Sequence, residues 1–266
     1  MKAFSCYLFQ SYAKGMRIKM VIGKYSEFIE LQARYPRKIS NDYMLQGDVQ
    51  RRLTNGALSF YADDKALFIF EQREGYVKLQ FRLIDTSAVL PPHNGSIAAY
   101  LAYREGRYPE KAAQWLREQG FSYRKSLLRH YAKELTDGSS YERVEKASAD
   151  EIYSMVGEYF EPAESDMPPR ELFEPSGVYC ARAPDGKIIG LVYDMGQTRV
   201  VAVSPEARGQ GVGRRLYRAY AQERLFENNA SVFHEWISPD NTASLAMFRS
   251  LGFVPDTAMS DCYAID

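Results

Sequence analysis

A chain of 266 residues is long enough to bury the core of one large domain or of two small ones. Apolar residues make up 45% and charged residues 26%, which is typical of a globular protein rather than a disordered one. Lysine plus arginine and aspartate plus glutamate both count 34, so no basic excess favours a nucleic-acid partner held by phosphate contacts. The three cysteines, Cys6, Cys180 and Cys262, form no CxxC pair and argue against a disulfide framework or a metal site.

The sequence also bears on location. It contains no apolar run long enough to cross a membrane. The first residues are a poor signal peptide, because no sustained apolar stretch follows the charge of Lys2. These features predict a cytoplasmic protein with no membrane partner.

The first half of the chain predicts a hairpin, a strand and a helix, in that order. Apolar runs at 57–61 and 66–71 flank the turn Asp63-Asp64-Lys65. A further strand ends near Ile84, and a helix ends at Gly120 before another strand begins. Between these two elements, the segment 89–95 contains two prolines and a single glycine, so it offers few N–H groups to a phosphate.

A polar, glycine-containing segment at 136–140 separates the halves and is typical of a linker. Beyond it, strands alternate with helices, which predicts an α/β layered domain. The expected elements are a helix at 149–160, a Pro- and acid-rich loop at 161–175, a hairpin of 178–182 with 188–193, a strand at 199–203, a helix from Val212, a strand at 231–237, a helix at 241–251 and a last strand at 262–265.

The two halves resemble each other. The helix end at Gly120 and the one at Gly252 are 132 positions apart, and the pairs Tyr131-Ala132 and Tyr263-Ala264 have the same offset. Both halves also carry a hairpin-like stretch upstream. The shared order predicts an internal duplication.

The strand 199–203 leads into a glycine loop, Arg208-Gly209-Gln210-Gly211-Val212-Gly213, that opens a helix. Its glycines allow a tight turn and a close approach of the backbone to a ligand. The unpaired N–H groups of the helix start favour an anion such as a pyrophosphate. A P-loop is excluded because no lysine follows, and a dinucleotide fingerprint because its third glycine is Arg214. A glycine turn without a ligand is the alternative interpretation.

A second motif, from Asn241 to Phe253, follows the glycine loop after an intervening strand. In this order the two motifs resemble those of the GNAT acetyltransferase superfamily. That family carries V-x-P-x-x-R-G-x-G-x-G after its fourth strand and N-x-x-A-x-x-[LY]-[YF]-x-x-x-G-F on a later helix. The matching residues are Val203, Pro205, Arg208, Gly209, Gly211 and Gly213 in the first motif, and Asn241, Ser244 in place of Ala, Phe248, Gly252 and Phe253 in the second.

The resemblance is clear for about residues 140–266 and implies an α/β fold of tandem GNAT-like domains, each a mixed, mostly antiparallel sheet flanked by helices. We predict a degenerate GNAT-like domain at 1–137, with its first ~16 residues peripheral, and an acetyl-CoA-binding domain at 138–266. The first copy lacks the glycine loop and is 13 residues shorter between its strand end and its helix end. We therefore expect it not to bind CoA, and either to shape the substrate groove or to stand in for a dimer partner.

The resemblance also implies how acetyl-CoA, the co-substrate, binds. Pantetheine lies in a gap between strands 200–204 and 231–237, and a backbone N–H near Val201 polarises the acetyl carbonyl. The pyrophosphate sits on the glycine loop. The expected cofactor-binding residues are Val201, Val203, Arg208, Gly209, Gln210, Gly211, Val212, Gly213, Arg214, Asn241 and Phe248.

The catalytic groups are less evident. Phe248 stands where the family often has a tyrosine that protonates the leaving thiolate, so Tyr263 or Tyr193 is a candidate substitute. His234 and Glu235 are candidate bases on opposite faces of one strand, of which Glu235 is preferred, although a solvated side chain is the alternative.

Two functions from different classes remain open. One is an N-acetyltransferase that moves an acetyl group by direct transfer from acetyl-CoA to a primary amine of a small molecule or peptide, as a monomer or homodimer. The other is a non-catalytic acyl-CoA-binding sensor or regulatory module. The acid-rich loop 161–175 would attract a cationic amine or simply form a solvated face.

Overall fold

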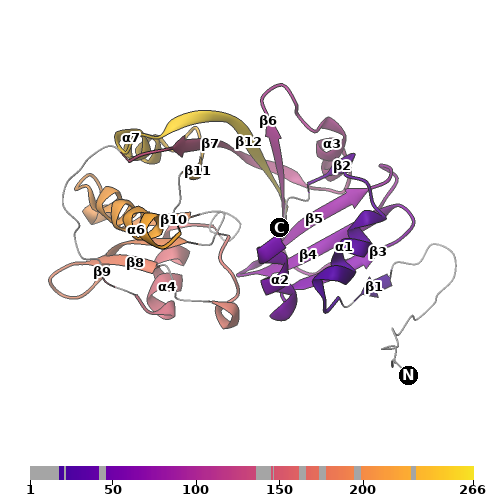
Figure 1. Ribbon diagram of the computed structural model, residues 1–266, viewed down its shortest axis with the longest axis horizontal. Coiled ribbons are helices and arrows are strands. Elements are labelled where there is room, and N and C mark those ends of the chain that lie inside the picture. Colours follow the sequence, from indigo (N-terminus) through magenta and orange to yellow (C-terminus); the bar gives the residue numbers. More distant parts are fainter. Residues whose placement is uncertain are drawn as a thin grey trace.

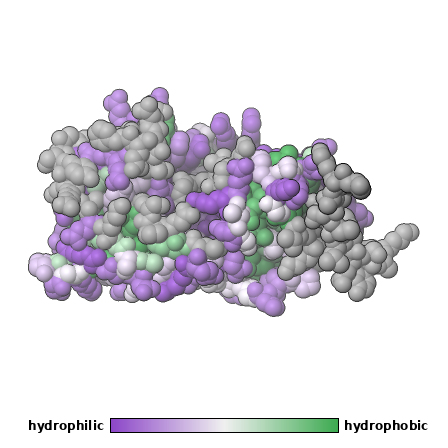
Figure 2. All heavy atoms as spheres, turned by 60° about the horizontal axis from the view of Figure 1, so that its bottom comes forward, coloured by the Kyte–Doolittle hydropathy of each residue, from purple (hydrophilic) through white to green (hydrophobic). Residues whose placement is uncertain are grey.

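The structure is a computed structural model that describes residues 18–20, 22–41, 46–135, 145, 147–161, 166–173, 178–194, 199–228 and 232–266. The predicted linker at 136–140 lies outside these residues. No helix in the described ranges is long and apolar enough to cross a membrane. On the face shown in Figure 2, the described surface is mostly hydrophilic, with apolar residues in small groups.

The first half contains a long sheet with helices on both faces (Figure 1). The strands β1 (Ile18–Met20), β3 (Leu58–Ala62), β4 (Ala66–Arg73), β5 (Tyr76–Leu83) and β6 (Ile97–Arg104) lie in that order, and the short β2 (Ile39–Ser40) pairs with β5. All pairs are antiparallel except β5 with β6. The helices described in this half are α1 (Tyr25–Ala33), α2 (Gln46–Thr54) and α3 (Glu110–Glu118).

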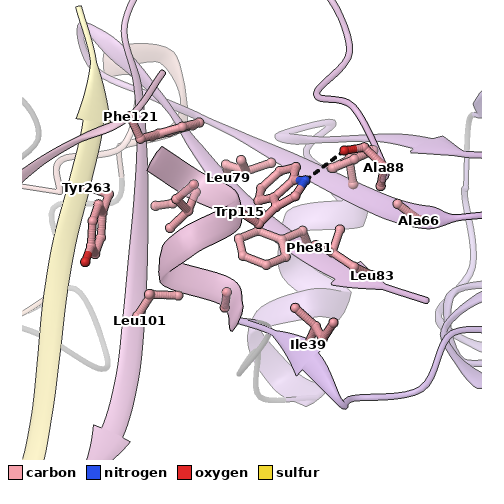
Figure 3. Packing of buried hydrophobic residues seen from close by; sticks show 14 of the residues in the cluster. Ile39, Ala66, Leu79, Phe81, Leu83, Ala88, Leu101, Trp115, Phe121 and Tyr263 are labelled. Atoms are coloured by element: carbon pink, nitrogen blue, oxygen red, sulfur yellow. Dashed lines mark hydrogen bonds between the residues drawn. The ribbon is translucent and has the colours of Figure 1, made fainter. Parts of the chain in front are cut away.

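The core of the first half forms under α3, where Trp115 is fully buried (Figure 3). Its indole Nε1 donates a hydrogen bond of 2.8 Å to the carbonyl of Ala88, so burial leaves its polar atom satisfied. The ring packs 4.7 Å from that of Phe81 on β5. The α1 side of the sheet has a separate apolar cluster that includes Phe28 and Phe60.

The second half begins with a three-stranded antiparallel sheet, in the order β10-β9-β8. Its strands are β8 (Val178–Arg182), β9 (Ile188–Asp194) and β10 (Arg199–Val203), which confirms the predicted hairpin and the strand after it. Helix α4 (Ala149–Tyr159) packs on one face through Ile152, Met155 and Val156. Helix α6 (Val212–Asn228) packs on the other face, and the 3-10 turns η1 (Arg170–Leu172) and η2 (Pro205–Ala207) complete the connections.

Two long strands are shared between the halves. The remaining elements are β7 (Ser122–Ala132), β11 (Phe233–Ile237), α7 (Thr242–Ser250) and β12 (Val254–Ile265). In the large sheet the order is β6-β12-β7-β11, so β12 of the second half lies between β6 and β7 of the first. Conversely, β7 pairs with β11 of the second half. Figure 1 shows β12 passing from α7 into the sheet of the first half.

The predicted fold class is confirmed: mostly antiparallel strands flanked by helices make up both halves. The offset seen in the sequence also relates element bounds, because 242 minus 110 (α7 and α3) and 254 minus 122 (β12 and β7) are both 132. The last strand was predicted too short at 262–265. It begins at Val254, because two neighbouring strands provide hydrogen bonds to a segment that contains proline and polar residues.

The predicted boundary at residue 137 stays a prediction, and strand pairing crosses it. Expressed separately, residues 1–137 and 138–266 should each fail to give a monomeric, cooperatively unfolding protein, because the edges of β6, β7, β11 and β12 lose their partners. Size-exclusion chromatography and thermal denaturation followed by circular dichroism test this expectation. Co-expression of the two pieces should restore a stable complex. A cooperative unfolding transition for either monomeric piece alone would contradict the claim that each half depends on the other for its folding.

Candidate functional site

In the described part of the chain, no strand pairs with the edge of β10 that faces away from β9. Ser204 N donates to Ile189 O at 3.0 Å, and Val201 and Val203 lie opposite Val192 and Gly190. Because the hydrogen-bonding direction alternates along an antiparallel strand, the backbone groups of Val201 and Val203 point away from β9. Beyond this edge the next strand is β11, which belongs to the other sheet and is not paired with β10. The two strands are therefore not hydrogen-bonded as neighbours in a sheet, as the predicted gap requires, and the binding of pantetheine between them stays a prediction.

The glycine loop lies directly after this edge. Gly209 and Gly211 have φ values of +76° and +75°, a left-handed conformation in which a side chain is strained. Within the loop, Arg215 Nη1 donates to Gln210 O at 2.9 Å, and Arg208 Nε donates to Val203 O at 3.1 Å. Residues 208–211 of the loop are exposed, whereas Val212 is buried and begins a helix of 17 residues. The first N–H groups of such a helix have no partner within it and favour an anion.

Two further glycines let α6 approach the sheets closely. A Cβ atom at Gly213 would lie 3.1 Å from Met247 Sδ and 3.2 Å from Val203 Cγ2. A Cβ atom at Gly190, on β9, would lie 2.7 Å from Val212 Cγ1, so only glycine fits there without movement of the helix. Sequence reasoning missed Gly190, because its role depends on a helix that follows it by more than twenty positions. Gly213 is predicted from the sequence as a position where the backbone approaches a ligand. Its close neighbours in the structure are protein side chains, and the contact with a ligand stays a prediction.

The two motif residues of α7 have structural contacts of their own. Asn241 is the N-cap, and its Oδ1 accepts a hydrogen bond of 3.0 Å from Ser244 N. Phe248 is 5% exposed and packs edge-on against Tyr217 at 4.9 Å and against Phe253 at 5.1 Å. Their contact with a cofactor stays a prediction.

A buried polar network bridges the gap at the start of β10. The guanidinium of Arg199 donates 2.7 Å to His234 O on β11 and 2.9 Å to the hydroxyl of Tyr220 on α6. It also lies 3.4 Å from Glu235 Oε1, which accepts a hydrogen bond from the Tyr217 hydroxyl. The Tyr220 hydroxyl in turn donates to Asp194 at 3.0 Å. A paired charge can be buried in this way, whereas an unpaired one would strongly destabilise the fold.

Burial dominates the electrostatics of Glu235. Desolvation raises the pKa of this carboxyl to about 7, although Arg199 and Tyr217 favour its charged form. The side chain points toward α6 on the same face as Phe233 and Ile237, and it is 4% exposed. The structure therefore covers Glu235 with Tyr217 rather than presenting it to a groove.

His234 points to the opposite face of β11 because side chains alternate along a strand. That side of the second half is where α4 packs against Val200 and Ala202. The ring is half-buried near Tyr131, and among the described residues its Nδ1 is buried without a hydrogen-bond partner. Burial, then Arg129, lowers the pKa of His234, so the neutral imidazole predominates at pH 7.

Comparison with known proteins agrees with this geometry. Residues 149–253 match the model of the acetyltransferase (GNAT) family. The C-terminal half is a GNAT domain. The chain is 33% identical over 95 residues to mycothiol acetyltransferase of Arthrobacter sp. (strain FB24), and 32% identical over 93 residues to the N-alpha-acetyltransferase RimI of Mycobacterium tuberculosis (strain ATCC 25618 / H37Rv). These matches cover 30% and 32% of this chain, but only 28% and 56% of the two relatives.

Solved structures share the fold over nearly the whole chain. A tandem GNAT protein from the clavulanic acid biosynthesis pathway aligns with a TM-score of 0.55 at 12% identity, covering 94% of this chain and 98% of its own. A GCN5-related N-acetyltransferase from Sphaerobacter thermophilus aligns with a TM-score of 0.53 at 12% identity, covering 94% and 95%. The likeness supports the tandem arrangement of the fold, with the GNAT domain second.

The structure does not bring Tyr263 to the glycine loop of the GNAT domain. Tyr263 lies on β12 opposite Ala99, in the core under α3 of the first half, and its hydroxyl is 2.6 Å from that of Tyr108. Figure 3 shows it in this cluster. Tyr193 packs against Phe173 at 5.0 Å in the cluster under α4. Sequence reasoning could not place Tyr263, because β12 pairs with β6 and β7 of the first half and this pairing decides which core the side chain enters.

The first half closes the edge that the GNAT domain leaves open. On β5, the carbonyl of Leu79 accepts 2.9 Å from Asn41 Nδ2, and Phe81 N donates 2.7 Å to Asn41 Oδ1. Strand β2 continues this pairing at Leu83. In chain order β5 corresponds to β10. Asn41 and β2 bond to the backbone of β5 here, whereas on the outward edge of β10 the carbonyl of Val203 accepts a hydrogen bond from Arg208 and no strand is paired within the described residues. This supplies a physical reason for the expectation that the first half binds no CoA.

The buried carboxyl of Glu235 predicts a pH-dependent stability. Its pKa rises from an ordinary value near 4.5 to about 7 on folding, so its stabilising contribution is complete below about pH 4.5 and is lost as the pH rises through about 7. Between about pH 5 and about pH 8, the free energy of unfolding should fall by on the order of 2–3 kcal/mol more in the wild type than in Glu235→Gln, which cannot titrate. Urea denaturation at each pH measures the free energy of unfolding of the wild type and of Glu235→Gln. Equal pH dependence in the two proteins would contradict the assignment, and the exposed Glu118→Gln is the control.

Proposed function

We propose that the chain is an acetyltransferase that uses acetyl-CoA to acetylate a primary amine. The observation that carries this proposal is the juxtaposition of an open β10 edge with a glycine loop at the start of a long helix. The outward-facing backbone groups of Val201 and the N–H of Val203 match the amides of a pantetheine arm, while the carbonyl of Val203 accepts a hydrogen bond from Arg208. The loop and helix start match a pyrophosphate, which also finds the cationic Arg208 and Arg214 nearby.

The chemistry requires a base that takes a proton from the amine. We assign this role to His234, because it faces the side of the sheet away from α6 and has a lowered pKa with an unpaired Nδ1. The amine nitrogen then forms a bond to the acetyl carbon as the carbon–sulfur bond breaks. The proton moves from the ammonium to the imidazole, and the departing thiolate is protonated from solvent.

Glu235 has a different role in this proposal. Through Arg199 it links β11 to β10 and α6 at one end of the gap, so it helps to set the width of the opening. The backbone N–H of Val201, on the open edge, is placed to polarise the acetyl carbonyl.

A non-catalytic acyl-CoA sensor is the second candidate function. It is favoured by Phe248, whose buried ring offers no proton to a thiolate, and by the position of Tyr263 in the other half. Release of free thiol from acetyl-CoA with a panel of primary amines separates the two functions. Binding without release for any amine would support the sensor.

Gly211→Glu should abolish acetyl-CoA binding. The substitution strains a residue at φ +75° and adds a negative charge beside the pyrophosphate site, so we expect at least about a 100-fold rise in Kd. Isothermal titration calorimetry should give one site per wild-type chain. Gly106→Glu is the matched control, because Gly106 has the same φ of +75° in a turn of the first half. Equal acetyl-CoA binding by Gly211→Glu and Gly106→Glu would contradict the assignment of the glycine loop as the binding site.

His234→Gln should lower turnover by about 100-fold or more while leaving the Kd of acetyl-CoA unchanged, because it removes a proton acceptor and no cofactor contact. In the wild type, turnover should rise with pH through a pKa below the ordinary histidine value of 6.5. Steady-state kinetics over pH measure both effects. Retention of full activity, or the same pH profile in the variant, would exclude His234 as the base.

A further inference from the structure

The segment that follows α4 is held to the first half by a partly buried carboxylate, that of Asp166. Asp166 Oδ1 accepts a hydrogen bond of 2.5 Å from the hydroxyl of Tyr76, and its Oδ2 lies 2.8 Å from Lys78 Nζ. Arg73 donates 3.1 Å to the backbone carbonyl of Asp166 and lies 3.3 Å from its carboxylate. All three partners belong to the β4–β5 hairpin of the first half. Within the predicted acid-rich loop, Asp166 is thus paired with cations of the first half rather than solvated.

The conformation of Asp166 supports a specific role for these contacts. Its φ of +50° makes it the one non-glycine residue with a positive φ in the described part of the chain. Residues other than glycine rarely adopt a left-handed conformation, so surrounding interactions must hold Asp166 in it. Burial alone would raise the pKa of Asp166, but Arg73 and Lys78 hold it well below its usual range. The carboxylate is therefore charged over the whole physiological range.

The hairpin residues are themselves fixed. Glu71 lies 2.8 Å from Arg73 and 2.7 Å from Arg52 of α2, and Lys78 lies 5.0 Å from the ring centre of Tyr100. The first half therefore presents a fixed cationic site to Asp166. Because Arg73 and Lys78 are already held by their neighbours, they lose little conformational freedom when they contact Asp166.

The residues after Asp166 contact both halves. Met167 is 2% exposed in the cluster under α4, and its carbonyl accepts 2.9 Å from Glu74 N of the hairpin turn. The carbonyl of Pro168 accepts 2.5 Å from the Tyr153 hydroxyl on α4. The position of α4 and that of the β4–β5 hairpin are consequently linked through three consecutive residues.

This link adjoins the proposed site. Helix α4 lies on the side of the sheet to which His234 points, opposite α6. At its end, the ring of Tyr159 lies 5.6 Å from the guanidinium carbon of Arg208 in the glycine loop. An amine that approaches the thioester from the side away from α6 therefore passes α4 and the segment that follows it. Figure 1 shows α4 on the opposite side of the β8–β9–β10 sheet from α6.

We propose that Asp166 is a positioning residue for the acceptor: its contacts with Arg73, Lys78 and Tyr76 fix α4 and the segment at 166–170 to the first half, and so define the amine-binding side of the GNAT domain. The inference rests on the acetyl transfer proposed above. It gives the first half a function, since that half supplies the rigid surface on which the acceptor side is assembled.

Asp166→Asn tests the proposal, because it keeps the shape of the side chain and removes the charge. We expect the KM for the amine to rise about tenfold or more, with kcat within about twofold and the Kd of acetyl-CoA unchanged. Hydrogen exchange of the amides at 166–173 should also become about tenfold faster. Glu151→Gln is the control, because it breaks the ion pair of α4 with Arg182 at the other end of the helix.

A soluble Asp166→Asn protein with an unchanged amine KM would overturn the proposal, and so would an equal rise in KM in Glu151→Gln, which would indicate general loosening of α4. Lys78→Met removes the partner charge and should reproduce the KM effect if Asp166→Asn is too unstable to assay. A wild-type protein that binds acetyl-CoA and acetylates no amine contradicts the proposed function itself. In that case the hydrogen-exchange measurement still tests the contacts of Asp166. An unchanged rate for the amides at 166–173 in Asp166→Asn would contradict the claim that Asp166 anchors this segment to the first half.

Discussion

The backbone hydrogen bonds between β7 and β12 are the constraint on which the rest of the structure depends. These two strands lie side by side in the middle of the large sheet, and each pairs on its other edge with a strand of the opposite half. Because neither half can complete its sheet alone, the position of β11 relative to β10 is fixed by the first half through β7. The width of the gap in the GNAT domain is therefore a property of the whole chain.

The same arrangement explains how one scaffold serves two purposes. In the GNAT domain the edge of β10 is open, and Arg199 connects it to β11 only at one end. In the first half, Asn41 and β2 bond to the equivalent edge of β5, and the glycine loop is absent. The two halves thus differ at this edge, and the first half also holds Asp166.

Sequence reasoning succeeded where the signal is local. The bounds of β10, the start of α6 and the glycine loop follow from a short motif, and the family assignment of residues 149–253 is confirmed. It failed where distant contacts decide. The length of β12 and the core that Tyr263 enters depend on the pairing of β12 with strands of the first half. The need for glycine at position 190 depends on packing against Val212. The contacts of Asp166 depend on Arg73 and Lys78 of the β4–β5 hairpin. The catalytic residues and the domain boundary stay predictions.

The strand exchange also bears on synthesis of the protein. The end of β6 at Arg104 and the start of β12 at Val254 are 150 positions apart, yet the two strands pair directly. During translation, β6 must therefore wait with an unpaired edge until the whole GNAT domain has left the ribosome. Maturation of the first half is therefore coupled to completion of the second half.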